Sequence, residues 1–211
     1  GGYSSSGNSG YCAGSFDNLR VYNRALEGSD VTTLFNHENG DQLRNTVKAK
    51  YDFNEGNIAN DTYGYFHGVA VNNPQLGTDR HGNPNSALRV TASDIQGIKI
   101  PYLNDYILQK GTIAFWLKPE DANSLPLESF IHLPNEKRSS TNVLMNNNIL
   151  MGRDNGTLFV NSTTGINEYE NFSMGSSFTN WQHVAITFDN TTVKTYLNGL
   201  LYSTVNTIQG N

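Results

Sequence analysis

Apolar and polar residues alternate in several short segments of the chain. In residues 112–118 the apolar Ile113, Phe115 and Leu117 fall on every second position, and residues 181–189 show the same period of two. Side chains of a β-strand point alternately to opposite faces of a sheet, so this period predicts strands with one buried face.

A further strand is predicted at residues 15–22, where the apolar Phe16, Leu19 and Val21 are separated by polar residues. Such a pattern fits a strand with one buried face. Shorter apolar or alternating pieces occur at residues 51–53, 67–71, 86–90 and 97–101. We interpret each of these as a short strand bounded by turns.

The strongest turn signal is Asn198-Gly199, which separates two apolar pairs. Both residue types tolerate the positive φ of a two-residue hairpin turn, so a β-hairpin is predicted here. Turn residues recur about every 8–12 positions, as they do in sandwiches of short strands. The fold class we expect is all-β, an antiparallel two-sheet jelly-roll sandwich.

One short helix is expected near the start of the chain. Val31, Leu34 and Phe35 recur at helical spacing, and Ser29 or Asp30 is suited to cap the first turn.

The composition excludes several classes of partner. The 211 residues carry a formal charge of −5 without a basic run, which argues against nucleic acid and against an anionic membrane surface. No apolar run is long enough for a transmembrane helix. A single cysteine, Cys12, excludes an internal disulfide framework and a multi-cysteine zinc site.

Motifs in two parts of the chain point to a family. Residues 14–26 read GSFDNLRVYNRAL, and later motifs are YDFN (51–54), NDTYG (60–64), DRHGNPNSAL (79–88), WQHVA (181–185) and YLNG (196–199). Together they resemble the laminin-G-like jelly roll of the concanavalin A-like lectin/glucanase superfamily. The first motif resembles the C-terminal strand of that family, and the others resemble its beginning and middle. The resemblance implies a single sandwich over residues 1–211.

The order of these parts is circularly permuted relative to the family. Residues 14–36 resemble the family's last strand and helical turn, 37–50 lack a period and form a connector, and 51–211 resemble the rest. A natural or engineered permutation, a fragment across two tandem repeats, or strand exchange between chains would explain this. Neither part buries a full core alone, so residues 14–26 must pair with the sheets of 51–211. Pairing within one molecule is favoured, and the chain is expected to be a monomer or a strand-exchanged oligomer.

A catalytic site is not expected. Some relatives hydrolyse glycans with paired carboxylates on one strand, in an E-x-D-x-E motif that this chain lacks. Glu168 and Glu170 are the nearest arrangement, and we interpret their segment as a loop. The five histidines, His37, His67, His81, His132 and His183, lack metal-ligand spacing.

A structural Ca²⁺ ion is implied by the resemblance, since many laminin-G-like domains hold one near the meeting point of their termini. The candidate ligands are Asp17 and Asp61, with Asp79 and Asn83 as weaker candidates. Calcium takes six to eight oxygen ligands, which polar loops supply. Ordinary turn capping by Asp and Asn is the alternative. If calcium is bound, chelation should lower the melting temperature.

Aromatic residues have two interpretations. Trp116 and Trp181 occupy positions that resemble the family's sandwich framework, so packing is favoured over sugar stacking. Candidates for a ligand platform in loops are Tyr63, Tyr65, Tyr102, Tyr106 and Tyr169.

The function we expect is a non-catalytic binding module, secreted or at the cell surface, for a glycan or an extracellular protein. This expectation follows from the resemblance and from polar loops on a rigid sandwich. The alternatives are a structural repeat that uses strand complementation between copies and, less favoured, a glycoside hydrolase or lyase.

Overall fold

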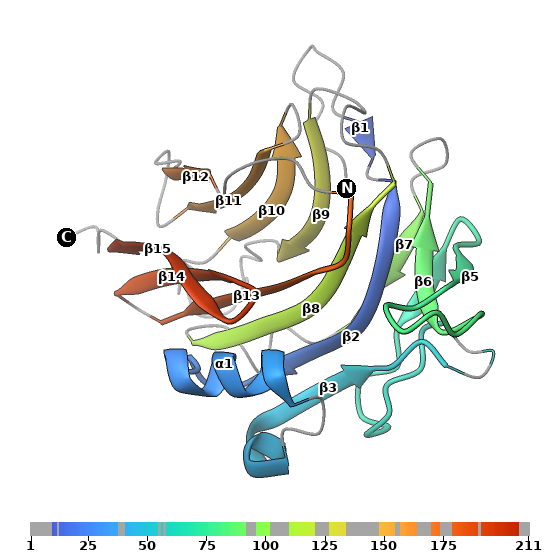
Figure 1. The fold of residues 1–211 in the computed structure, drawn as a ribbon, viewed down its shortest axis with the longest axis horizontal. Helices are drawn as coiled ribbons and strands as arrows, with labels where there is room; N and C mark the ends of the chain where they lie inside the picture. The colour runs from blue at the N-terminus through green and yellow to red at the C-terminus, as the bar shows by residue number, and fades with distance from the viewer. Residues whose placement is uncertain are drawn as a thin grey trace, which may run out of the picture.

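The computed structural model contains two stacked β-sheets, with a helix on the outer side of the larger sheet (Figure 1). It describes residues 10–11, 13–37, 41–54, 56, 58–91, 96–101, 110–120, 127–133, 148–154, 157–163, 170–173, 179–189 and 191–206. The expected class, an antiparallel all-β sandwich with one short α-helix, is confirmed.

The large sheet has eight strands in the order β15-β14-β13-β8-β2-β6-β5, with β3 paired to β2 beside β6. These strands are β2 (Gly14–Tyr22), β3 (Val47–Tyr51), β5 (Gln75–Gly77), β6 (Ala87–Val90), β8 (Gly111–Pro119), β13 (Gln182–Phe188), β14 (Thr192–Leu197) and β15 (Leu200–Asn206). All of their pairings are antiparallel.

The small sheet has five strands in the order β1-β9-β10-β11-β12. They are β1 (Gly10–Tyr11), β9 (Leu127–Leu133), β10 (Asn148–Asp154), β11 (Thr157–Thr163) and β12 (Glu170–Ser173). A separate pair is formed by β4 (Val69–Val71) and β7 (Gly97–Lys99). The strands of the small sheet and β5 are not among those that the sequence predicts.

The main core lies between the two sheets. Phe115, Leu117, Val184 and Ile186 of the large sheet are fully buried there, together with Met151 of β10. The apolar positions of period two in β8 and β13 therefore form the inner face of the large sheet, as predicted. The hairpin at Asn198-Gly199 is also confirmed, since both residues have positive φ and join β14 to β15.

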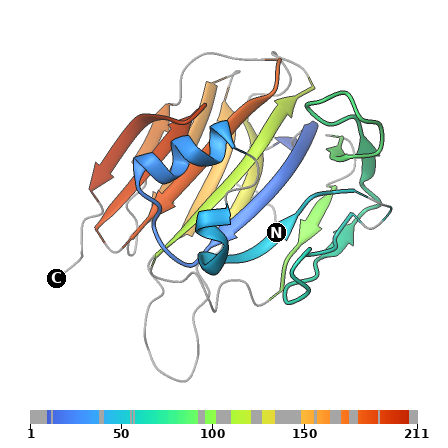
Figure 2. The same ribbon diagram turned by 60° about the horizontal axis from the view of Figure 1, so that its bottom comes forward.

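A second core lies on the outer face of the large sheet, the face that carries helix α1 (Gly28–Asn36). Val31 and Leu34 of the helix are buried against β8, β13 and β14, and Figure 2 shows the helix over this part of the sheet. The expected cap at Ser29 or Asp30 is wrong, because the helix already begins at Gly28. Its N-cap is Glu27, whose backbone N–H donates to the Asp30 carboxylate at 3.2 Å.

The expected connector at residues 37–50 is wrong over residues 41–50, which form regular structure. A 3₁₀ helix, η1 (Asp41–Thr46), and strand β3 occupy it. Ala49 and Tyr51 point into the main core. These two residues alternate with lysines, as in a strand with one buried face. The strand is hard to recognise in the sequence because Ala and Lys are depleted in strands.

Strand β2 lies inside the large sheet of its own chain. It pairs with β8 along its whole length, with β6 at residues 14–16 and with β3 at residues 19–22. This is the intramolecular pairing that the sequence favours. The permuted order relative to the family stays an interpretation.

Candidate functional site on the outer face of the large sheet

A bulge in β2 determines which of its side chains reach the outer face. Asp17 pairs with Trp116 and Arg20 with Ala114, so two residues of β2 lie opposite one residue of β8. Asn18 adopts a φ of 50°. Bulges of this kind redirect side chains. As a result Leu19 packs against the main core, while Asp17 and Arg20 both lie on the outer face.

Asp17 is buried in this face and forms an ion pair with Arg80, which reaches over from the loop between β5 and β6. The Arg80 guanidinium lies 4.9 Å from the centroid of the Trp116 ring. Burial raises the pKa of the Asp17 carboxyl from 3.8 to about 6, because desolvation outweighs the opposing charge and hydrogen bond of Arg80. The carboxylate therefore depends on one cationic partner.

Trp116 packs against two further rings. Phe35 of α1 stacks on it at 5.7 Å, and His183 of β13 meets it edge-on at 5.4 Å. Burial lowers the pKa of His183 to about 4, and the charges of Arg20 and Arg80 act in the same direction. The imidazole is thus neutral at physiological pH. These contacts fit the packing interpretation of Trp116, because they fasten α1 and Arg80 to the sheet.

Asp61 has a different set of partners. Its Oδ1 accepts hydrogen bonds from the backbone N–H of Lys50 at 2.8 Å and of Tyr63 at 3.2 Å. Its Oδ2 accepts from the N–H of Tyr65 and of Phe66, both at 3.0 Å. Asp61 is 1 % exposed. One carboxylate therefore holds the loop of residues 63–66 against the end of β3 through four backbone donors.

The loop held by Asp61 presents an exposed aromatic ring. Tyr65 is 81 % exposed, although the backbone on both sides of it is fixed and the next residue, Phe66, is buried in the main core. His67 and Val69, two and four positions further along the chain, are also exposed. We call Tyr65, His67, Val69 and the exposed Asn60 the Tyr65 surface.

Two contacts keep the Tyr65 surface together. The backbone N–H of Gly68 donates to the carbonyl of Ala59 at 2.8 Å, which brings residue 60 beside His67. The backbone N–H of Asp61 donates to Nδ1 of His67 at 3.3 Å. Because Nδ1 accepts this bond, the neutral imidazole carries its proton on Nε2 as a donor. The surface thus combines an aromatic face, an amide and an imidazole donor.

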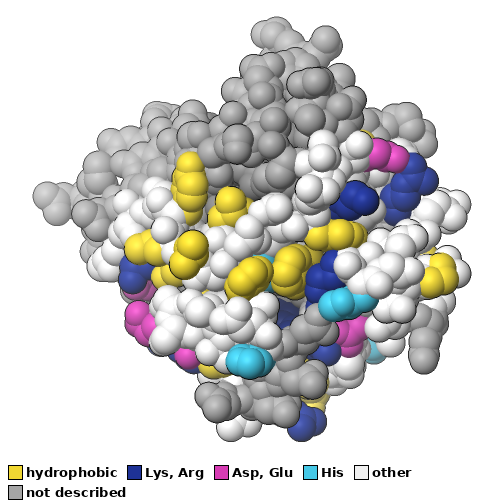
Figure 3. All heavy atoms as spheres, in the orientation of Figure 1, with side chains coloured by type: hydrophobic (Ala, Val, Ile, Leu, Met, Phe, Trp, Pro, Cys, Tyr) yellow, Lys and Arg dark blue, Asp and Glu magenta, His cyan; other side chains and the backbone are white. Residues whose placement is uncertain are grey.

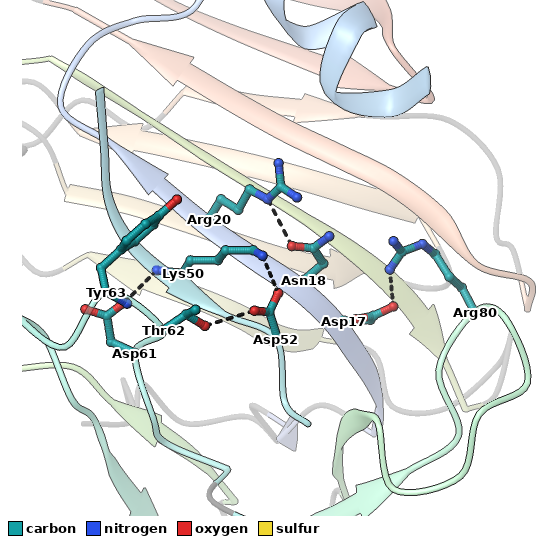
Figure 4. Close-up of polar contacts among 9 residues, drawn as sticks. All are labelled: Asp17, Asn18, Arg20, Lys50, Asp52, Asp61, Thr62, Tyr63 and Arg80. Carbon is teal, nitrogen blue, oxygen red and sulfur yellow. Dashed lines mark hydrogen bonds and ion pairs between the residues drawn. The ribbon is translucent and has the colours of Figure 1, made fainter. Parts of the chain in front are cut away.

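A row of polar side chains lies between Asp17 and Asp61 (Figure 4). Lys50 forms an ion pair with Asp52 at 2.8 Å, and the Thr62 hydroxyl donates to the same carboxylate at 2.9 Å. This row ties β3 to the loop held by Asp61.

The two predicted calcium ligands are not brought together. Asp17 and Asp61 lie at opposite ends of the drawn row, with Asp52 between them (Figure 4). One is paired with Arg80 and the other accepts four N–H donors. Among the residues with a described position, no group of three His, Cys, Asp or Glu side chains could hold a metal ion. The two aspartates do not fit a shared calcium site, and calcium binding stays a prediction.

The weaker candidates, Asp79 and Asn83, form a turn. Oδ1 of Asp79 accepts from the backbone N–H of His81 and of Asn83, both at 2.8 Å, and Oδ2 accepts from the Asn83 side chain at 2.9 Å. Burial raises the pKa of Asp79, but these hydrogen bonds outweigh it and lower the pKa below its ordinary value. This is the turn chemistry that was the alternative to calcium.

Several other candidates lie outside the described residues: Cys12, Tyr102, Tyr106, Glu168 and Tyr169, as well as the side chains of His132 and Glu170. Glu170 is the first residue of β12, so its backbone belongs to a strand and not to the expected loop. Of the remaining histidines, His37 and His81 are exposed. Trp181 is half-buried just before β13.

Sequence reasoning missed the role of Arg80 and the anchoring role of Asp61. The Arg80 contact joins residues 63 positions apart and leaves no local signal. Asp61 opens an Asp-Thr-Tyr-Gly turn, and Asp side chains commonly bond backbone N–H groups two residues on, so its local bonds were readable.

A family model described as the concanavalin A-like lectin/glucanases superfamily, of laminin-G type, matches residues 93–210. This range is more than half of the chain, so the protein belongs to that superfamily. Searches of curated proteins and of solved structures gave no match. Within the described residues, no helix has the length and apolar character needed to cross a membrane.

Proposed function

We propose that this member of the concanavalin A-like lectin/glucanase superfamily is a non-catalytic extracellular module that binds a glycan through the Tyr65 surface. The observation that carries the proposal is the exposure of Tyr65, at 81 %, on a backbone fixed by the Asp61 carboxylate. Laminin-G-like domains are typically extracellular binding modules without catalysis, although the superfamily includes glycosidases.

The physical support is pre-organisation. A large ring that remains in water gives up the stabilisation of burial, which is about 1.5–3 kcal/mol for a large apolar side chain. Binding to a ring whose backbone is already fixed loses less conformational entropy than binding to a mobile loop. Functional residues are concentrated on loops that a rigid scaffold positions.

The chemistry of the Tyr65 surface suits a sugar. A pyranose has an apolar C–H face that can stack on the Tyr65 ring and contact Val69, and hydroxyls at its rim. The Nε2–H of His67 and the Asn60 amide offer both donors and an acceptor to those hydroxyls. Ligand sites commonly combine one aromatic contact with a few placed polar groups in this way.

A glycan array followed by calorimetry on the best ligand tests the proposal. We expect Tyr65→Ala to weaken binding at least tenfold, about 1.4 kcal/mol, and Tyr65→Phe to preserve most of the affinity because the ring remains. His37→Ala removes another exposed ring and should change nothing. Melting temperatures of all three variants should match the parent protein, since each position is exposed.

An array without a ligand, or a ligand whose affinity is unchanged in Tyr65→Ala, would overturn the proposal. In the first case a protein ligand for the same surface becomes the next hypothesis, to be tested with the same variants. Strand complementation between copies has no support from β2, because β2 already pairs inside its own chain.

A further inference from the structure

Three consecutive residues that follow the Asn198-Gly199 turn expose large apolar side chains. Leu200 is 73 % exposed, Leu201 is 56 % exposed and Tyr202 is 46 % exposed. In Figure 3 hydrophobic side chains gather where the β14–β15 hairpin lies in Figure 1. We call residues 196–203 the hairpin tip. Exposed apolar groups that gather in this way mark a surface that binds a protein or a membrane.

The two leucines of the hairpin tip point to opposite faces of the hairpin. Leu200 pairs with Leu197, which packs against the main core. Leu201 pairs with Tyr196, which is buried in the second core beside α1. Directly opposed residues of an antiparallel pair share a face, and successive residues of a strand alternate between the faces. A protein partner that lies flat on one face would therefore cover only one of the two leucines.

The turn of the hairpin tip is held by two neighbouring elements. The Thr32 hydroxyl of α1 donates to the carbonyl of Gly199 at 2.9 Å. The backbone N–H of Asn198 donates to the carbonyl of His183 in β13 at 2.8 Å, and the backbone N–H of His183 donates to the Asn198 side chain at 3.0 Å. The exposed apolar residues therefore follow a turn that is already fixed, so little conformational entropy is lost when the tip binds.

The segments that meet at this turn carry no charged side chain. Residues 31–36 of α1, 179–182 at the start of β13 and 195–206 of the hairpin contain no Lys, Arg, Asp or Glu, in a chain with 14 basic and 19 acidic residues. Moving a charge from water into an apolar medium costs free energy. The hairpin tip can therefore enter such a medium without burying a charge from any of these three segments.

We propose that the hairpin tip inserts into the interfacial region of a bilayer of zwitterionic lipid, such as phosphatidylcholine. Lipid surrounds an inserted tip, so Leu200 and Leu201 are both buried although they point to opposite faces. Tyr202 follows them, and tyrosine is enriched at membrane–water interfaces because it combines an apolar ring with a hydroxyl. The tip has no Lys or Arg for anionic headgroups and the chain carries a formal charge of −5, so attraction to anionic lipid does not contribute.

Labels at the two leucine positions test whether both enter the bilayer. In a Cys12→Ser background, Leu200→Cys and Leu201→Cys are each labelled with an environment-sensitive fluorophore and titrated with phosphatidylcholine vesicles. We expect the emission of both labels to shift to the blue and to be quenched by brominated lipid, because both positions leave water. The same label at Thr78→Cys, on the exposed loop between β5 and β6, should not respond.

The partition coefficient of the protein between water and these vesicles measures the contribution of the two leucines. We expect Leu200→Ser/Leu201→Ser to lower the coefficient at least tenfold, a change of about 1.4 kcal/mol, since both substitutions remove apolar area that the bilayer would bury. Leu200→Ile/Leu201→Ile keeps that area and should retain the coefficient of the parent protein. Phosphatidylserine added to the vesicles should not raise it. Equal melting temperatures show that both double variants fold.

The proposal is wrong if the parent protein does not bind phosphatidylcholine vesicles at any lipid concentration, or if the double serine variant binds them as well as the parent. It is also wrong if only one of the two leucine labels responds, because contact on a single face is what a flat partner would give. A partition coefficient that depends on phosphatidylserine would contradict it as well, since binding would then be electrostatic and the charge-free hairpin tip could not supply it.

Discussion

Asp17 and Asp61 are both buried carboxylates, and they are accommodated in opposite ways. Asp17 lies in a strand and relies on a single guanidinium from a residue 63 positions away. Asp61 lies in a loop and accepts four backbone N–H donors, all within 11 positions of it. A long-range ion pair fastens two distant segments, whereas local backbone bonds define the shape of one segment.

The two aspartates also differ in how their negative charge is stabilised. Desolvation prevails over Arg80 at Asp17 and raises the pKa of that carboxyl to about 6. The Asp61 carboxylate is independent of any single side-chain partner, since all four of its donors belong to the backbone. Substitutions should therefore affect the two regions differently.

The largest effect is expected for Asp61→Ala, which leaves four backbone donors without their acceptor. Hydrogen bonds to a charged group contribute about 1.5–3 kcal/mol each, and water will replace some of the lost bonds, so we expect a loss of about 4 kcal/mol in the free energy of unfolding. Urea denaturation measures it.

Asp52→Ala is the matched control for this prediction. Asp52 is partly exposed and binds Lys50 and Thr62. Surface ion pairs contribute about 0–1 kcal/mol, so its loss should be within that range. Equal losses for the two variants would show that the four backbone bonds of Asp61 have no special weight.

The next effect is that of Arg80→Met, which leaves the Asp17 carboxylate buried without its cation. Removing one partner of a buried ion pair costs about 3–5 kcal/mol. Because Met retains part of the contact with Trp116, we expect a loss near the lower limit, measured by urea denaturation at a pH of about 8.

Adding Asp17→Asn to Arg80→Met separates charge from packing. The double variant no longer buries an unpaired charge and should be more stable than Arg80→Met alone. If the double variant is less stable, the loss in Arg80→Met comes from the missing cation–π contact with Trp116. It then does not come from the burial of an unpaired Asp17 charge.

The two aspartates also show what could be read from the sequence. The strands β8, β13 and β14–β15 were predictable, because their apolar period and the Asn198-Gly199 turn are local signals. The bulge in β2 was visible as a change of phase between Phe16 and Val21, although that pattern alone did not reveal where the side chains would point.

Long-range partners could not be predicted. No sequence pattern near Asp17 indicates that Arg80 is its ion-pair partner. None near Trp116 indicates that Phe35 stacks on its ring. The exposure of Tyr65 likewise depends on how the loop is anchored, and many loop tyrosines looked equivalent in the sequence. The family resemblance implies one common role, calcium binding, for Asp17 and Asp61. In the structure Asp17 forms an ion pair with Arg80, whereas Asp61 accepts backbone hydrogen bonds.

A smaller effect concerns the pH dependence of stability. Asp17 has a folded pKa of about 6 against 3.8, so the folded state binds the extra proton and this contribution to stability falls as pH rises from about 4 to 6. His183 has a folded pKa of about 4 against 6.5, so the unfolded state binds the extra proton and its contribution rises over nearly the same range. The two contributions should nearly cancel in the parent protein.

Single substitutions should reveal each slope. Relative to the parent protein, Asp17→Asn should gain stability with rising pH between about 4 and 6, and His183→Gln should lose it, by up to about 1.4 kcal/mol per pH unit. Urea denaturation at several pH values measures the difference in slope, from which other titrating groups drop out. Parallel curves for all three proteins would contradict the opposed titrations.

The smallest effect is expected from calcium removal. An ion at Asp61 would have to displace backbone donors from both oxygens, and an ion at Asp17 would have to displace the Arg80 guanidinium from a buried position. We therefore expect a chelator to shift the melting temperatures of the parent protein, Asp17→Asn and Asp61→Asn by the same amount, within about 1 °C. A larger fall that is lost in Asp17→Asn or in Asp61→Asn would instead support the sequence-based calcium prediction, and the variant that loses it would identify which of the two carboxylates binds the ion.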